Sequence, residues 1–297
     1  MSIVLGPNQY GKAETRVVRV IRDGPVHIIR DLNVSTMLHG DFAAAHVDGD
    51  QANVLPTDTQ KNTSYAFASE PGIAEIEDYA LSLARHFVAD IEPVHTARVE
   101  VDEYPWERIG APAAGHPHAF VRSGQEVRTA AVTVQGDQAW VVSGLKDLVV
   151  LKTAGSEFAG FLRDEYTTLQ DASDRILATS LTAAWRYLYP SAAWADAYAE
   201  VKEILLERFA NVHSRALQQS LWDMGKAVLE ARGDIAEIRL SAPNKHHFLV
   251  DLAPFGLANP GEVFHADDRP YGLIQCAVQR DDASPAGPAW DSAAAFC

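Results

Sequence analysis

The order of strand-like and helix-like segments is the feature of this sequence that most restricts its fold. Runs rich in Val, Ile and other β-forming residues lie together along the chain, and stretches with helical spacing of apolar residues separate these runs. Strands that alternate one by one with helices are typical of a parallel doubly wound sheet. Segregated strands and helices favour antiparallel sheets, so the sequence predicts an α+β fold.

The order strands, helices, strands occurs twice, which suggests a duplicated module with halves at 1–137 and 138–297, although no residue-level repeat is visible. Gly136-Asp137 is typical of a tight hairpin turn at the boundary, and Gly233 is a plausible helix stop. The predicted strands are 14–22, 27–38, 96–104, 119–122, 127–135, 139–143, 148–152, 236–241, 245–252 and 271–279, and the predicted helices are 75–87, 201–212 and 217–228.

Charge and composition exclude several classes of function. The chain of 297 residues has 25 Lys and Arg against 40 Asp and Glu, a formal net charge of −15. Such a chain repels nucleic acid and anionic membranes, so we expect neither as a partner. Two cysteines, Cys276 and Cys297, are too few for a disulfide framework or a thiolate zinc site. Without a signal peptide or membrane span, a cytoplasmic protein is expected. No glycine-rich phosphate loop occurs, so a nucleotide cofactor is not indicated.

Short segments spread over nearly the whole chain resemble the uricase (urate oxidase) family of bacterial type, in the family's order and at its approximate spacing. They are 8–12 (NQYGK), 57–63 (TDTQKNT), 155–158 (GSEF), 163–169 (RDEYTTL), 174–177 (DRIL), 217–219 (LQQ), 243–248 (PNKHHF) and 268–272 (DRPYG). The resemblance implies a tandem tunnelling fold (T-fold), in which each half is an antiparallel four-stranded sheet with two helices on one face. It also implies a homotetramer whose sheets close into a barrel.

The activity implied by the resemblance is the oxidation of urate by O2 and water to 5-hydroxyisourate and H2O2, with neither metal nor organic cofactor. Urate is a planar monoanion, so its site needs a stacking ring, a forked cation and an amide. By resemblance Phe158 lies over the purine plane, Arg175 makes the forked contact and Gln218 pairs with the opposite edge. Leu217, where many members have Val, is expected to bind through its backbone.

The same resemblance implies a proton relay of Lys12, Thr57 and His246, which withdraws a proton so that the purine can donate electrons to oxygen. Asn244 and the Thr57 hydroxyl would hold oxygen and then water, and Asp58 would contact the purine through its main-chain N–H. In the family the residues near the beginning of the chain and those near its end come from neighbouring subunits. Here the first group contains Lys12 and Thr57, and the second contains Phe158, Arg175, Gln218, Asn244 and His246. The active site is therefore expected at a subunit interface.

Each of these residues, taken alone, also has an ordinary structural explanation. A single Phe such as Phe158 is usually a core residue, Arg175 beside Asp174 is usually a surface ion pair, and Gln218 could be a solvated helix cap. Thr57-Asp58 is also typical of the N-cap before a helix, whose free N–H groups favour an anion, so both explanations can hold there.

Three other functions compete with a uricase. A metal site would use His116 and His118 with His95 and His86 upstream, but the His-Pro-His segment 116–118 lacks a third ligand at a recognisable spacing and its proline restrains the geometry. A different T-fold enzyme acting on a pterin-like heterocycle is the second, because a fold does not determine a function. A non-catalytic purine-binding homologue is the third, and it predicts the loss of a relay residue, whereas all three are present.

Overall fold

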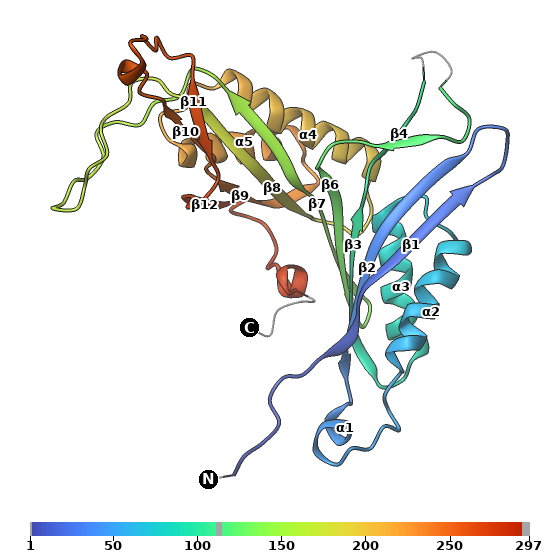
Figure 1. The fold of residues 1–297 in the computed structure, drawn as a ribbon. Helices are drawn as coiled ribbons and strands as arrows, with labels where there is room; N and C mark the ends of the chain where they lie inside the picture. The colour runs from blue at the N-terminus through green and yellow to red at the C-terminus, as the bar shows by residue number, and fades with distance from the viewer. Residues whose placement is uncertain (1, 111–114, 293–297) are drawn as a thin grey trace.

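One eight-stranded antiparallel sheet organises the molecule, with the strand order β1-β2-β3-β6-β7-β8-β9-β12 and the longer helices on one face (Figure 1). The structure is a computed structural model that describes residues 2–110 and 115–292. The strands of the sheet are β1 (Tyr10–Ile21), β2 (Ile28–Gly40), β3 (Val94–Glu103), β6 (Val127–Gln135), β7 (Gln138–Lys152), β8 (Leu177–Tyr187), β9 (Ile235–Pro243) and β12 (Leu273–Gln279). The α+β class with antiparallel pairing is confirmed.

The helices are α1 (Ala43–Val47), α2 (Thr57–Ser69), α3 (Ile76–Asp90), α4 (Trp194–Asn211) and α5 (Leu217–Ala231). Two small sheets pair β4 (Trp106–Arg108) with β5 (Phe120–Arg122), and β10 (His246–Leu249) with β11 (Phe264–Asp267). The core lies between the helices and the main sheet. In β2 alternate residues are buried against the helices, as the period of two along a strand requires: Leu32, Val34, Thr36 and Leu38.

The two halves of the chain have the same element order within the main sheet. Two strands, two helices and two strands (β1, β2, α2, α3, β3, β6) are followed by the same series again (β7, β8, α4, α5, β9, β12). The predicted hairpin turn joins the halves, because Gln135 pairs with Gln138 and Gly136 has a φ of 55°. A glycine adopts this left-handed conformation at little cost. The sheet therefore runs continuously from one half into the other.

Several predicted boundaries were wrong. The segments 139–143 and 148–152 belong to one strand, β7, whose register shifts at a bulge between Leu145 and Leu148 where Asp147 has a φ of 60°. The sequence patterns did not identify β8, and they gave only the beginning of α2. Helix α5 ends at Ala231 without using Gly233 as a left-handed stop, because its C-cap is Arg232.

The segment after Arg280 packs on the sheet face opposite the helices. It contains a short 3-10 turn, η2 (Gly287–Trp290), seen as the red coil in Figure 1. Arg98 donates a hydrogen bond to the carbonyl of Ala289 (3.2 Å), and Trp290 donates one to Glu237 (2.9 Å). The segment is thus anchored to strands of both halves. Cys297 lies outside the described residues, as does part of the loop 110–117.

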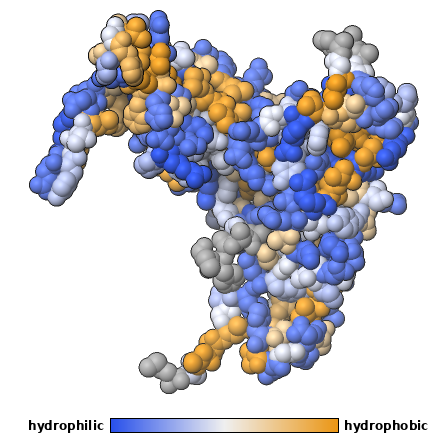
Figure 2. Space-filling view, in the orientation of Figure 1, coloured by the Kyte–Doolittle hydropathy of each residue, from blue (hydrophilic) through white to orange (hydrophobic). Residues whose placement is uncertain are grey.

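No helix in the described ranges is long and apolar enough to cross a membrane. One of several patches of exposed apolar residues lies at the end of the molecule that carries β10 and β11, where Figure 2 shows orange residues on the outer surface. The side chains exposed there include Phe248, Leu249, Phe255 and Leu257.

Candidate active site

Lys12 is positioned by the pairing of β1 with β2. It lies directly opposite Thr36 in the antiparallel register, so the two side chains share one face of the sheet. Thr36 is 1% exposed and faces the helices, so Lys12 also projects to the face that α2 covers. The strands approach closely at this point, since a Cβ on Gly11 would lie 1.8 Å from the Thr36 carbonyl oxygen. Only glycine is compatible with this approach.

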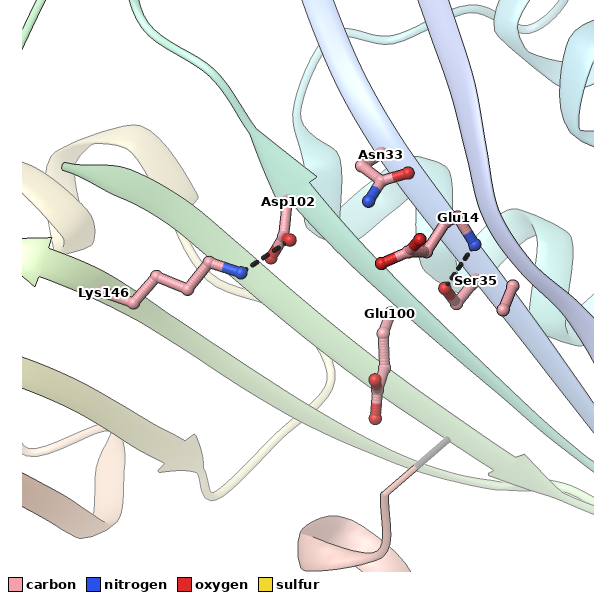
Figure 3. A pocket seen from close by; sticks show the side chains of 7 residues that line it. Glu14, Asn33, Ser35, Glu100, Asp102 and Lys146 are labelled. Atoms are coloured by element: carbon pink, nitrogen blue, oxygen red, sulfur yellow. Dashed lines mark hydrogen bonds and ion pairs between the residues drawn. The ribbon is translucent and has the colours of Figure 1, made fainter. Parts of the chain in front are cut away.

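A bulge directly after Lys12 interrupts the regular pairing of β1 with β2, which resumes at Thr15. The register shifts between Lys12 and Thr15, Glu14 has a φ of 55°, and the Glu14 N–H donates to the Ser35 hydroxyl at 3.0 Å. Figure 3 shows this hydrogen bond at the edge of a polar hollow of about 380 Å³, which Glu100 and two further charged residues also line. None of the predicted site residues lines this hollow. It lies on the sheet face opposite to that of Thr36 and Lys12, because Ser35 lines it and side chains alternate between the two faces along β2.

Thr57 is the first residue of α2, so the prediction that a helix begins here is confirmed. Its predicted capping role is wrong, because Pro56 occupies the N-cap and the cap has no side-chain hydrogen bond. The first backbone N–H groups of a helix have no intrahelical acceptor and carry a partial positive charge. The N–H groups of Thr57 and Asp58 are among these, so this end of α2 suits an anion.

Lys12 and the beginning of α2 are close enough to interact electrostatically. The Asp58 carboxylate pairs with the Lys61 ammonium, and this contact holds the pKa of Asp58 below its usual range. The positive charge of Lys12 lowers the pKa of Asp58 further. Lys12, Thr57 and Asp58 therefore form one group at the edge of the sheet.

A second group is built around the loop between β7 and β8. Ser156 and Ser214 form a parallel bridge, in which the Glu157 N–H donates to the Ser214 carbonyl at 2.8 Å. The Arg175 N–H donates to the Ser156 carbonyl at 2.7 Å, and the Asp174 carboxylate accepts the Ser156 N–H at 3.1 Å. These bonds tie the loop to the segment that enters α5.

Phe158 and Arg175 are in contact within this loop. The guanidinium carbon of Arg175 lies 5.0 Å from the centroid of the Phe158 ring, and the backbones of Phe158 and Ala172 exchange two hydrogen bonds. Arg175 is half-buried, and burial lowers the pKa of its guanidinium. Its Nε is buried with no hydrogen-bond partner among the described residues. Phe158 is not a core residue, because it is only partly buried. Arg175 is not held in a surface ion pair, because it makes no ion pair among the described residues.

The beginning of α5 presents Leu217 and Gln218 beside the same loop. Leu217 is the first residue of the helix and is 5% exposed, whereas Gln218 is exposed. The capping contact belongs to the next residue, because Gln219 accepts the N–H of Arg215 at 3.0 Å. Gln218 is therefore not needed for capping, and its amide lies at the surface.

Asn244 and His246 follow β9 at the far side of the sheet. The Asn244 N–H donates to the Gly272 carbonyl at 2.8 Å, and the Asn244 backbone bridges to Thr179 of β8. The Asn244 amide nitrogen lies 3.5 Å from Nδ1 of His246, whose ring stacks on Phe248. His246 lines a hollow of about 410 Å³, which Phe158 and Arg175 do not line.

The two groups of predicted site residues do not meet within one chain. β1 is an edge strand, and six interstrand spacings separate it from β9. At about 4.8 Å per spacing this is roughly 29 Å along the sheet. Figure 1 shows β1 and α2 on one side of the molecule and β10 with β11 on the other. No hydrogen bond or ion pair between described residues joins the groups.

The histidines of the alternative metal site lie in separate places. His86 contacts Asp90 at 2.7 Å, His95 contacts Asp41 at 3.0 Å, and the rings of His116 and His118 contact each other. Among the described residues no group of three or more His, Cys, Asp or Glu side chains is arranged to hold a metal ion.

Sequence reasoning missed the residues that support the site. The buried pair Thr36 and Gln60 is one example, and the Asp174 carboxylate that ties the loop together is another. A signal for Gln60 does exist, because Gln60, Ser64 and Ala68 recur at steps of four and form the buried stripe of α2.

The sequence and the structure of this chain are similar to those of known uricases. The family model described as uricase matches residues 8–133 and 141–275. A uricase of Arthrobacter globiformis is 50% identical over 295 residues, which is 99% of this chain and 96% of that protein, and a Danio rerio uricase is 36% identical over 91% of this chain and 93% of that protein. The crystal structure of the Arthrobacter globiformis uricase has a TM-score of 0.94 at 50% identity and covers 98% of this chain and 100% of that chain.

Proposed function

The chain belongs to the uricase family and is a urate oxidase, and from this premise we propose which of its residues bind urate and which move protons. The reaction is urate + O2 + H2O → 5-hydroxyisourate + H2O2. Urate gives two electrons to O2, water adds to the oxidised ring, and two protons leave with the peroxide. The protein must therefore hold the purine, place oxygen beside it and transfer protons.

Arg175 and Phe158 bind the purine in this proposal. The observation that supports it best is the buried Nε of Arg175, which has no partner among the described residues although its guanidinium lies against the Phe158 ring. An N–H group buried without an acceptor costs free energy, and an anionic purine edge would supply that acceptor. Phe158 stacks on the plane of the ring, Gln218 pairs with the opposite edge and Leu217 contributes its backbone.

Lys12, Thr57 and His246 form the proton relay in this proposal. The ammonium of Lys12 and the hydroxyl of Thr57 belong to one group, as the influence of Lys12 on Asp58 supports. The relay withdraws a second proton from the urate monoanion, which makes the ring a stronger electron donor toward O2. Asn244 and the Thr57 hydroxyl hold oxygen and then water, and the free N–H of Asp58 contacts the purine.

The complete site requires two copies of the chain. Lys12, Thr57 and Asp58 of one protomer would meet Phe158, Arg175 and the other late residues of its partner. The separation of about 29 Å within one chain supports this arrangement. Both edges of the sheet, β1 and β12, are unpaired within the described chain, and exposed edges favour pairing with another copy. We propose a homotetramer in which tandem T-fold modules, 1–137 and 138–297, close into a barrel.

A spectrophotometric assay tests the cofactor-free reaction. Purified protein is incubated with urate before and after treatment with a metal chelator, and both loss of urate absorbance and formation of H2O2 are followed. We expect one peroxide for each urate consumed, at the same rate in both samples. A rate abolished by the chelator and restored by added metal would contradict the proposal. Turnover of a pterin with no turnover of urate would favour the other kind of T-fold enzyme.

A further inference from the structure

We propose that the buried hydrogen bond between Thr36 and Gln60 is a positioning device that fixes Lys12 relative to Thr57. The inference rests on the proposed proton relay, and it assigns to two residues outside the relay the task of keeping its first two members in register. Thr36 and Gln60 are both buried, and the proposal gives neither a contact with urate. They act through the strand and the helix on which the relay residues lie.

The contact itself is fully buried. Gln60 is 0% exposed and Thr36 is 1% exposed, and the Thr36 hydroxyl donates to the Gln60 amide oxygen at 2.8 Å. The Gln60 amide nitrogen donates to the Leu55 carbonyl at 3.5 Å, and the Tyr10 hydroxyl donates to the same carbonyl at 3.1 Å. The bonds therefore connect β1, β2, the loop before α2 and α2 itself in one network.

The network joins the neighbours of the two relay residues. Thr36 lies directly opposite Lys12 in the pairing of β1 with β2, and on the same face of the sheet. Gln60 follows Thr57 by three residues, which is about one turn of α2. One hydrogen bond thus sets both the height of α2 above the sheet and its shift along β1 at the place where Lys12 and Thr57 must face each other.

A packing role alone does not explain a buried glutamine here. Apart from Glu77, the buried residues of α3 are apolar or aromatic, including Leu83 and Phe87, whereas those of α2 are Gln60, Ser64 and Ala68. An apolar side chain at position 60 would avoid the cost of burying an amide. Apolar packing is non-directional, however, whereas a hydrogen bond has a defined distance and angle. The amide thus gives α2 one defined position above the sheet.

The functional consequence follows from the sensitivity of proton transfer to distance. A misplacement of about 1 Å can reduce a rate roughly 100-fold. Loss of the Thr36–Gln60 bond should therefore lower kcat through the Lys12–Thr57 geometry. It should affect binding of the purine less, because Arg175 and Phe158, which supply the charged and stacking contacts, belong to the other group, and α2 supplies only the Asp58 N–H.

Substitutions at Thr36 test the inference. Thr36→Val keeps the shape of the side chain and removes the donor, whereas Thr36→Ser keeps the hydroxyl. We expect Thr36→Val to lower kcat by about tenfold or more while the Kd of an unreactive purine analogue changes by less than about threefold. Thr36→Ser should retain kcat within about threefold of the parent. The double variant Thr36→Val/Gln60→Met leaves no unpaired polar group and should fold, and it should show the same loss of kcat.

The matched control is Tyr79→Phe, which removes another buried hydrogen bond to α2, from the Tyr79 hydroxyl to the Ser64 carbonyl at 2.7 Å. It should lower the melting temperature and leave kcat unchanged. The inference is overturned if Thr36→Val keeps its kcat, if Thr36→Ser loses as much as Thr36→Val, or if Tyr79→Phe loses as much. Lys12→Met distinguishes failure of the proton relay from failure of the positioning role. If Lys12→Met leaves turnover intact, the proposed relay itself fails. If it abolishes turnover while Thr36→Val has no effect, only the positioning role fails.

Discussion

Replacing Arg175 by alanine should weaken purine binding without weakening the fold. The guanidinium is half-buried against Phe158, and its Nε has no acceptor among the described residues. A hydrogen bond to a charged group contributes about 1.5–3 kcal/mol. Since about 1.4 kcal/mol corresponds to a factor of ten, the Kd of an unreactive purine analogue should rise roughly 10- to 150-fold. Arg175→Lys should restore only part of the affinity, because an ammonium lacks the planar fork.

Arg175→Ala should not destabilise the folded protein, whereas replacing a buried arginine that has hydrogen-bond partners should. A buried N–H without an acceptor destabilises the folded state, so its removal should leave the free energy of unfolding unchanged or raise it by up to about 1 kcal/mol. Arg98→Ala is the matched control, because Arg98 is 7% exposed and donates to Glu100 and Thr133, each at 2.8 Å. That variant should lose about 2 kcal/mol or more.

Two measurements check this prediction. Isothermal titration calorimetry with the analogue gives the Kd, and denaturant or thermal unfolding without ligand gives the stability. Unaltered affinity in Arg175→Ala would mean that the purine binds elsewhere. A loss of stability as large as that of Arg98→Ala would mean that Arg175 is a structural residue, and the assignment of its buried Nε to a ligand would be refuted.

Two further predictions concern the other group of site residues. Lys12→Met should reduce turnover by roughly 10²- to 10⁴-fold while the Kd of the analogue stays the same. Steady-state kinetics and a parallel titration of the analogue measure the two quantities, and unchanged turnover refutes the relay. Asp58→Asn should flatten the acid side of the stability–pH profile, because a carboxyl with a lowered pKa stabilises the fold above its unfolded pKa of about 4 and loses that contribution as pH falls through its folded pKa. Thermal unfolding between about pH 2 and 5 measures it, and an unchanged acid limb would contradict the lowered pKa.

The sequence patterns predicted the elements whose signals are local. The hairpin at Gly136-Asp137 needs a left-handed glycine, and α3 has apolar residues at helical spacing, so both were found. Strand β8 was missed although burial alternates from Thr179 to Trp185, because it contains four alanines and serines within Leu177–Ala184 that have weak β propensity. Strand β7 was divided in two because Asp147, at the bulge, resembles a turn residue.

Sequence patterns also predicted only part of the candidate site. Individual residues such as Arg175 and Lys12 were predicted through motifs, but their partners depend on tertiary contacts. Thr36 and Gln60 are 24 residues apart, and no periodicity in the chain relates a strand residue to a helix residue at that separation. The orphan Nε of Arg175 likewise becomes visible only when its surroundings are known.

The central claim is that two protomers jointly form each active site, and activity in mixed oligomers tests it most directly. Lys12→Met and Arg175→Ala subunits are each expected to be nearly inactive alone, and the two are then co-expressed or refolded together in equal amounts. Random assortment should place an intact Lys12 group against an intact Arg175 group in roughly one quarter of the sites, so about that share of the parent activity should return. If each site lay within one chain, no mixture would regain activity, and the account would be contradicted.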